Sequence, residues 1–177
     1  MLEGVIREST EKAQTKALRR DGYLIANIYG GAGNINCAFK KNEFMRFVKA
    51  KEGLIFDVKL GSKKYSVVIQ EYQKDPVTYD LLHVDLRIAD GKKKQKFMIP
   101  VVAKGTPKGL KNRGVFVMMH RRIPVVCFPK DVPNSFELEV SDLDVDDSII
   151  VRDIVTPKSV AIKLNESVAV VGVIKAK

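Results

Sequence analysis

The sequence predicts a mainly β protein with a few short helices, and three observations lead to that prediction. Apolar and polar residues alternate along several runs, as in Leu82–Ile88, which is the pattern of half-buried strands. Helical spacing is confined to two short stretches near the N-terminus. Six of the seven prolines lie beyond residue 90, between short apolar runs, so the C-terminal half is expected to be all-β.

Two helices are expected in the first ninety residues. Ser9 or Thr10 is a suitable N-cap for the first, which runs to Arg20 and is too polar to bury much surface. Asn42 is a suitable N-cap for the second, which Gly53 would end. The apolar side chains of the second helix recur at helical spacing, so they are expected in the core rather than in a stacking site: Phe44, Phe47 and Val48.

Strands are expected between and after these helices. The glycine-rich stretch 30–34 lacks the Lys-Ser/Thr of a P-loop and opens no helix, so a hairpin turn is the better interpretation. Pro76 cannot donate a ladder hydrogen bond and should separate the last two strands. The expected strands are residues 2–7, 24–29, 35–40, 54–60, 65–73 and 82–88.

The composition changes near Gly91, which places a domain boundary there and divides the chain into residues 1–90 and 91–177. Residues 91–122 contain ten Lys or Arg and no acid, whereas residues 131–153 contain eight acids and one base, Arg152. The lysines of residues 92–96 are interpreted either as phosphate contacts in a flexible linker or as solubilising charge. Strands of this second domain are expected within residues 115–119, 123–128, 159–164 and 168–174.

The overall charge favours an anionic partner. A formal charge of +10 makes nucleic acid the first choice and an acidic membrane surface the second. No run approaches the ~20 apolar residues of a transmembrane helix, and no secretory signal is visible, so a cytoplasmic protein is expected. Cys37 and Cys127 are far apart in apolar contexts, which predicts buried reduced thiols without zinc or a disulfide.

One strand is a candidate recognition surface. Along residues 82–88 the polar side chains of His83, Asp85 and Arg87 fall between apolar ones, so they share one face. Most polar strand faces are simply solvated. The strand's flanking Gln-Lys-Asp-Pro turn and the basic charge of the chain favour recognition.

This stretch resembles a known family, the large-subunit ribosomal proteins that bind 5S ribosomal RNA, in the longer general-stress (CTC) form with an added C-terminal domain. The resemblance rests on an ordered set of residues over about ninety positions. The matching residues are Lys16, Leu18, Arg19, Ile28-Tyr29-Gly30-Gly31, Gln73, Pro76 and Leu82-His83-Val84-Asp85.

The resemblance implies a small β-barrel-like RNA-binding domain followed by an all-β domain, no cofactor, and a structural role in the large ribosomal subunit as a monomer when off the ribosome. Phosphate contacts would come from Arg7, Lys12, Lys16 and Arg19, and ribose or base contacts from Tyr29, Gln73, His83 and Asp85. This sequence departs from the family pattern at Ala17, Ile25 and Asp75, where Arg, Pro and His are usual.

Two other functions were weighed. A hydrolase could use His83 and Asp85, but two residues on one strand face with no third partner do not make a catalytic pocket. Asp142, Asp144 and Asp146 are spaced like part of a calcium loop, but the glycine required at its sixth position is absent, and the alternating residues between them predict a strand.

Overall fold

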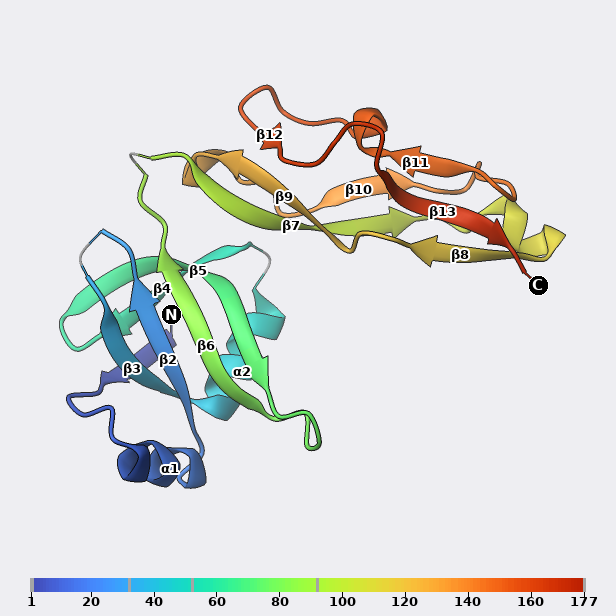
Figure 1. The fold of residues 1–177 in the computed structure, drawn as a ribbon. Coiled ribbons are helices and arrows are strands. Elements are labelled where there is room, and N and C mark those ends of the chain that lie inside the picture. Colours follow the sequence, from blue (N-terminus) through green and yellow to red (C-terminus); the bar gives the residue numbers. More distant parts are fainter. Residues whose placement is uncertain (1, 32, 52, 92, 177) are drawn as a thin grey trace. The chain divides into compact units, whose positions relative to one another are not determined.

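The computed structural model describes residues 2–31, 33–51, 53–91 and 93–176, and the chain forms two compact units, Met1–Lys92 and Lys93–Lys177 (Figure 1). Both units are built mainly from strands, which confirms the predicted fold class. Among the described residues no helix is long and apolar enough to cross a membrane.

The first unit is a closed barrel with the strand order β1-β3-β2-β6-β5-β4. β2 runs parallel to β6 and β1 parallel to β4, while the remaining neighbours are antiparallel. Closure leaves no free strand edge, which removes a route to aggregation. The elements are β1 (Leu2–Ile6), α1 (Lys12–Arg20), β2 (Tyr23–Tyr29), β3 (Ile35–Lys40), α2 (Lys41–Ala50), β4 (Ile55–Leu60), β5 (Lys63–Lys74) and β6 (Leu81–Ile88).

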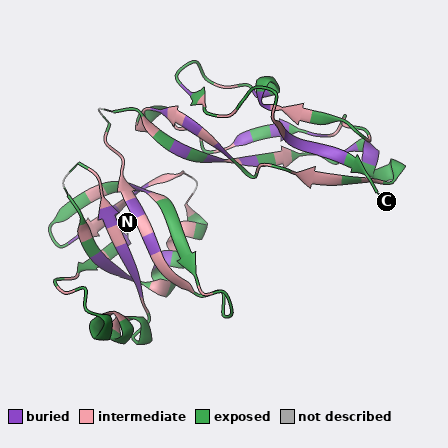
Figure 2. Cartoon of the chain, in the orientation of Figure 1, coloured by how far each residue is buried: buried purple, intermediate pink, exposed green. Residues whose placement is uncertain are grey.

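The barrel interior holds the alternating apolar residues of the strands (Figure 2). Phe44 of α2 is buried, and Phe47 and Val48 pack against the same cluster, which confirms them as core. The ring centroids of Phe39 and Phe44 lie 5.8 Å apart, within the range of favourable aromatic pairs. β2 and β3 pair antiparallel up to Ile28 and Ile35, so the glycine-rich stretch between them is a hairpin connection, as predicted.

The predicted helix caps are wrong at both helices. α1 begins after Glu11, and the Ser9 hydroxyl accepts only the Glu11 N–H, at 3.2 Å. α2 begins one residue before Asn42, with Lys40 as N-cap, because β3 leads directly into it. The backbone N–H of Lys41 donates to the Gly22 carbonyl at 3.0 Å, so one of the free donors of the first turn is satisfied from another element.

The second unit contains two sheets, with strand orders β10-β7-β9-β12 and β11-β13-β8. Several of its strands match the predicted runs, but the prediction missed β7, whose residues 95–100, Pro100 included, pair with β9 and whose residues 101–104 pair with β10. Gln95 and Lys96 belong to β7, so this end of the lysine run is strand and not linker; Lys92 lies outside the described residues. The strands are β7 (Gln95–Lys104), β8 (Gly114–Met118), β9 (Arg122–Cys127), β10 (Phe136–Glu139), β11 (Ser148–Ile150), β12 (Ala161–Ile162) and β13 (Ala169–Lys175), with 3-10 turns η1 (Lys108–Asn112), η2 (Pro129–Asp131) and η3 (Val151–Asp153).

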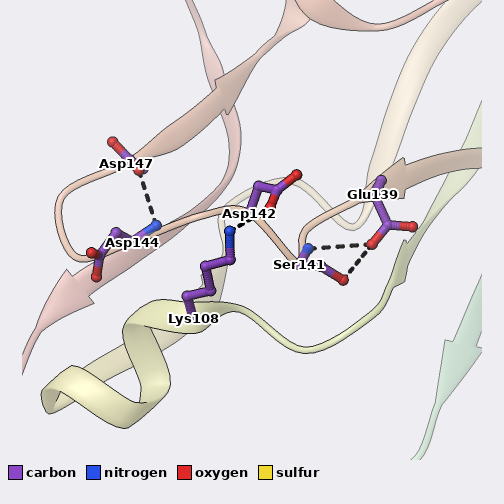
Figure 3. Close-up of polar contacts among 6 residues, drawn as sticks. All are labelled: Lys108, Glu139, Ser141, Asp142, Asp144 and Asp147. Carbon is purple, nitrogen blue, oxygen red and sulfur yellow. Dashed lines mark hydrogen bonds and ion pairs between the residues drawn. The ribbon is translucent and has the colours of Figure 1, made fainter.

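The basic and acidic segments of the second unit contact each other. Lys104 Nζ lies 2.6 Å from Glu137 Oε2, and Lys108 Nζ lies 2.6 Å from Asp142 Oδ1. Figure 3 shows Lys108 reaching Asp142 beside a turn in which the Asp147 carboxylate accepts the Asp144 N–H. Residues 141–147 form turns and irregular backbone and not the predicted strand. The carboxylates of Asp142, Asp144 and Asp147 accept hydrogen bonds from protein donors. Among the described residues no group of three or more His, Cys, Asp or Glu could hold a metal ion.

Candidate nucleic-acid interface

The polar residues of β6 lie on the outer surface of the barrel. Val84 and Leu86 are buried in the core cluster. Side chains alternate along a strand, so His83, Asp85 and Arg87 point outward. His83 and Asp85 are only 23% and 28% exposed, and His83 Nδ1 lies 3.6 Å from Asp85 Oδ1. Both groups are thus held against the barrel while one side of each stays accessible.

Neighbouring strands add two of the predicted residues to this surface. Gln73 of β5 is the register partner of His83, and Tyr29 of β2 is the partner of Arg87. Register partners in adjacent strands project to the same side of a sheet. The barrel therefore brings Tyr29, Gln73, His83 and Asp85 onto one surface, which we call the outer polar face.

Partial burial and nearby charges shift the pKa of the Tyr29 phenol. Partial burial raises its pKa most, the Arg87 guanidinium opposes that increase, and the carboxylates of Asp85 and Glu71 add to it. The Tyr29 hydroxyl consequently remains protonated and can donate a hydrogen bond at neutral pH.

The predicted phosphate contacts of α1 share one helical face. Lys12, Lys16 and Arg19 recur at i, i+4 and i+7, and all three are exposed. No residue of α1 is buried, and its last turn carries Arg19 and Arg20, whose charges suit the negative end of the helix dipole. α1 is therefore an exposed basic helix attached to the barrel.

Arg7 differs from the other basic residues because it is bound within the protein. Its Nη2 donates to Thr15 Oγ1 of α1 at 2.7 Å, and its backbone N–H donates to the Asn36 carbonyl at 2.8 Å. Arg7 thus joins α1 to the start of β3. It can orient the basic helix in addition to any contact of its own.

Asp75, one of the departures from the family pattern, builds the turn between β5 and β6. Its Oδ1 accepts the N–H groups of Val77 and Thr78, each at 2.8 Å. These bonds, the one from Thr78 first, lower the pKa of the Asp75 carboxyl. The turn also holds Tyr79 at a positive φ of 57°. Pro76 follows the end of β5, and the strand break predicted there is confirmed.

The other two departures from the family pattern, Ala17 and Ile25, lie on α1 and β2. Ala17 is exposed on α1 and supplies no charge. Ile25 is buried and is the register partner of His83 in β2. The two cysteines are free and buried, as predicted, and burial raises the pKa of the Cys37 thiol to about 12.

Sequence reasoning missed two polar residues on either side of Asp85. Glu71 of β5 and Asn27 of β2 are both register partners of Asp85. Asn27 Oδ1 is buried and has no hydrogen-bond partner among the described residues. No local pattern could reveal this neighbourhood, since β2 and β6 are far apart in the chain and the partners depend on register.

A closed barrel with a polar strand face and an exposed basic helix, followed by a second β unit, defines a mainly β protein of two compact units. Residues 2–86 match the Ribosomal L25p family, and residues 94–177 match the C-terminal domain of ribosomal protein TL5. The chain belongs to the ribosomal L25p family.

Curated relatives are similar to this chain over their whole length. The chain is 57% identical to the large ribosomal subunit protein bL25 of Wolinella succinogenes, with 100% of both chains covered. It is 54% identical to the bL25 protein of Helicobacter pylori strain J99 and 57% identical to that of Nitratiruptor, again with 100% of each chain covered. These relatives are named as ribosomal proteins, which sets aside the hydrolase hypothesis for His83 and Asp85.

Proposed function

We propose that this protein is a structural constituent of the large ribosomal subunit that binds 5S ribosomal RNA through its outer polar face and helix α1. Membership of the ribosomal L25p family supports the ribosomal role and, with it, a cytoplasmic, ribosome-associated location. The RNA contact is supported by one observation above all: the barrel register gathers Tyr29, Gln73, His83 and Asp85 on one accessible surface.

The chemistry of this surface suits double-helical RNA. The minor groove of A-form RNA is wide and shallow and displays 2′-hydroxyls and base edges, so a flat sheet face can reach them. Lys12, Lys16 and Arg19 would hold phosphates, while the outer polar face would contact riboses and bases. Off the ribosome we expect a monomer.

The test is binding of the full chain to 5S ribosomal RNA at fixed salt, compared with an unrelated duplex of equal length, together with footprinting of the RNA. We expect tighter binding to 5S ribosomal RNA and a protected double-helical segment. Equal affinity for both RNAs would contradict the proposal.

A further inference from the structure

The three-stranded sheet of the second unit has an open edge at β8. The strand order β11-β13-β8 places β8 at one end of the sheet, beside β13 (Figure 1). Among the described residues, the backbone hydrogen bonds of β8 join it to no strand other than β13. An edge of this kind can pair with a strand from another chain.

The hydrogen bonds of β13 show which groups of β8 face the open edge. The Val173 N–H donates to the Asp147 carbonyl at 2.9 Å, and the Val173 carbonyl accepts the Asp146 N–H at 2.8 Å. Both groups of Val173 therefore point away from its register partner in β8, which is Phe116. Since bonding alternates along an antiparallel ladder, the N–H and C=O of Phe116 and Met118 point to the open edge.

The side chains of β8 leave this edge unprotected. Natural proteins protect such edges with charges, proline or a bulge, whereas Gly114–Met118 is apolar, contains no proline and has no buried residue. A bulge is formed where Met119 and His120 both donate to the Val170 carbonyl, but it lies beyond the end of the strand. Val115 is 46% exposed. An apolar edge without protection indicates a surface that a partner covers.

Basic side chains stand at both ends of β8. All of them are exposed, and none forms an ion pair with a described residue, unlike Lys104 and Lys108. Unpaired cations on both sides of an apolar strand favour a partner whose acidic residues lie on both sides of an apolar segment. The basic residues are Lys111 and Arg113 before the strand, Arg121 and Arg122 after it, and Lys175, the register partner of Gly114.

We propose that β8 is a docking edge for an extended segment of another protein, which joins the sheet as a fourth strand. The segment has apolar side chains in its middle and acidic residues at its ends. Main-chain hydrogen bonds to the open edge provide affinity, and alternate side chains provide specificity. The proposal concerns the second unit and does not depend on RNA binding by the barrel.

Two other occupants fit the edge less well. In an antiparallel pair of β8 strands from two copies of this chain, the Arg113 end of one strand would lie against the Arg121 end of the other, and like charges would repel. RNA would satisfy the basic ends, but the apolar side chains and outward carbonyl groups between them offer nothing to its phosphates.

Amide hydrogen exchange tests the added strand directly, in the free protein and in large ribosomal subunits that contain it. The Phe116 and Met118 amides should exchange freely in the free protein and be slowed by about tenfold or more in the subunit. The Val115 and Val117 amides, which bond to β13, are the internal control and should be protected in both. Equal exchange of Phe116 and Met118 in both samples would overturn the proposal.

A photo-crosslinking amino acid in place of Met119 identifies the occupant within large ribosomal subunits. Met119 is 47% exposed and lies just beyond β8. We expect a crosslink to a protein segment in which acidic residues flank an apolar stretch. A crosslink to RNA, to a second copy of this chain or to a segment without acidic residues, or no crosslink at all, would overturn the proposal.

Val115→Lys tests whether the edge itself is required for this crosslink. The added charge should reduce the yield of the crosslink from position 119 by about tenfold, as a lysine on an edge strand opposes pairing. Ile174→Lys is the matched control, because Ile174 is the register partner of Val115 and is 47% exposed but lies on β13, one strand from the edge. Circular dichroism of both free variants checks the fold. Equal losses, or no loss for Val115→Lys, would overturn the proposal.

Discussion

At the scale of single residues, Asp85 is the side chain whose substitution best discriminates recognition from bulk electrostatics. Asp85→Asn should weaken binding to 5S ribosomal RNA by ~1–3 kcal/mol, the range for one good base contact, because Asp85 lies half-buried in the middle of the outer polar face. Binding to unrelated duplex should stay level or improve. The measurement is the ratio of the two affinities at fixed salt, and a ratio at or above that of the wild type would remove Asp85 from the interface.

Asp75 provides a residue-scale prediction about stability and pH. Its folded-state pKa lies below the ordinary value of 3.8 because the ionised carboxylate accepts two backbone N–H groups. A depressed pKa stabilises the fold above the unfolded-state pKa, and that contribution disappears as the pH falls through the folded value. Asp75→Ala should therefore melt at a lower temperature than wild type at pH 7.

The difference in melting temperature between wild type and Asp75→Ala should shrink as the pH falls below 3.8. Asp75→Asn is the control, because it keeps an acceptor oxygen but cannot titrate. A difference that stays constant with pH would mean that the charge of Asp75 contributes nothing to the turn.

At the scale of elements, α1 presents its basic face to solvent and should contribute mainly non-specific affinity. Arg19→Ala should weaken binding to all RNAs and reduce the slope of log affinity against log salt by about one unit, as for one lost phosphate contact. Arg46→Ala is the control, since Arg46 is an exposed arginine of the other helix, α2. An unchanged slope for Arg19→Ala would place Arg19 outside the interface.

The contact between β1 and the barrel core depends on Gly4. A Cβ at this position would lie 2.8 Å from both Leu60 Cδ2 and Phe39 Cδ1, and still closer to Phe39 Cε1. Phe39 and Leu60 are fully buried and cannot move aside cheaply. Gly4→Ala should destabilise the fold by about 1–3 kcal/mol in chemical denaturation, the usual cost of overpacking. Gly91→Ala, which meets nothing within 4 Å, should be nearly neutral.

At the scale of the whole molecule, every residue of the proposed RNA interface belongs to the first compact unit, Met1–Lys92. That unit is a closed barrel with its own core, so a fragment of residues 1–92 should fold and bind 5S ribosomal RNA with nearly the affinity of the full chain. Circular dichroism checks the fold and a mobility-shift titration checks binding. Binding of 5S ribosomal RNA by residues 93–177 alone would contradict the assignment of RNA binding to the first unit.

Local patterns in the sequence were sufficient for most of the strands, for the core face of α2 and for the outward side of β6. The reason is that a period of two or of 3.6 residues records which side of an element is buried. The start of α2 was wrong because the Lys41 N–H obtains its hydrogen-bond partner from Gly22 rather than from a capping side chain. β7 was missed because the lysines of residues 92–96 were interpreted as a linker, whereas residues 95–100 pair with β9.

Only the tertiary structure could show which strands are neighbours. The parallel pairing of β2 with β6 puts Tyr29 beside Arg87 and Asn27 beside Asp85, although these pairs are separated by most of the barrel's sequence. Periodicity assigns a side chain to a face of its own strand, whereas the residue beside it depends on non-local hydrogen bonds and on barrel closure. For that reason the individual polar residues of the outer face could be predicted, but the pairing of Asp85 with Glu71 and Asn27 could not.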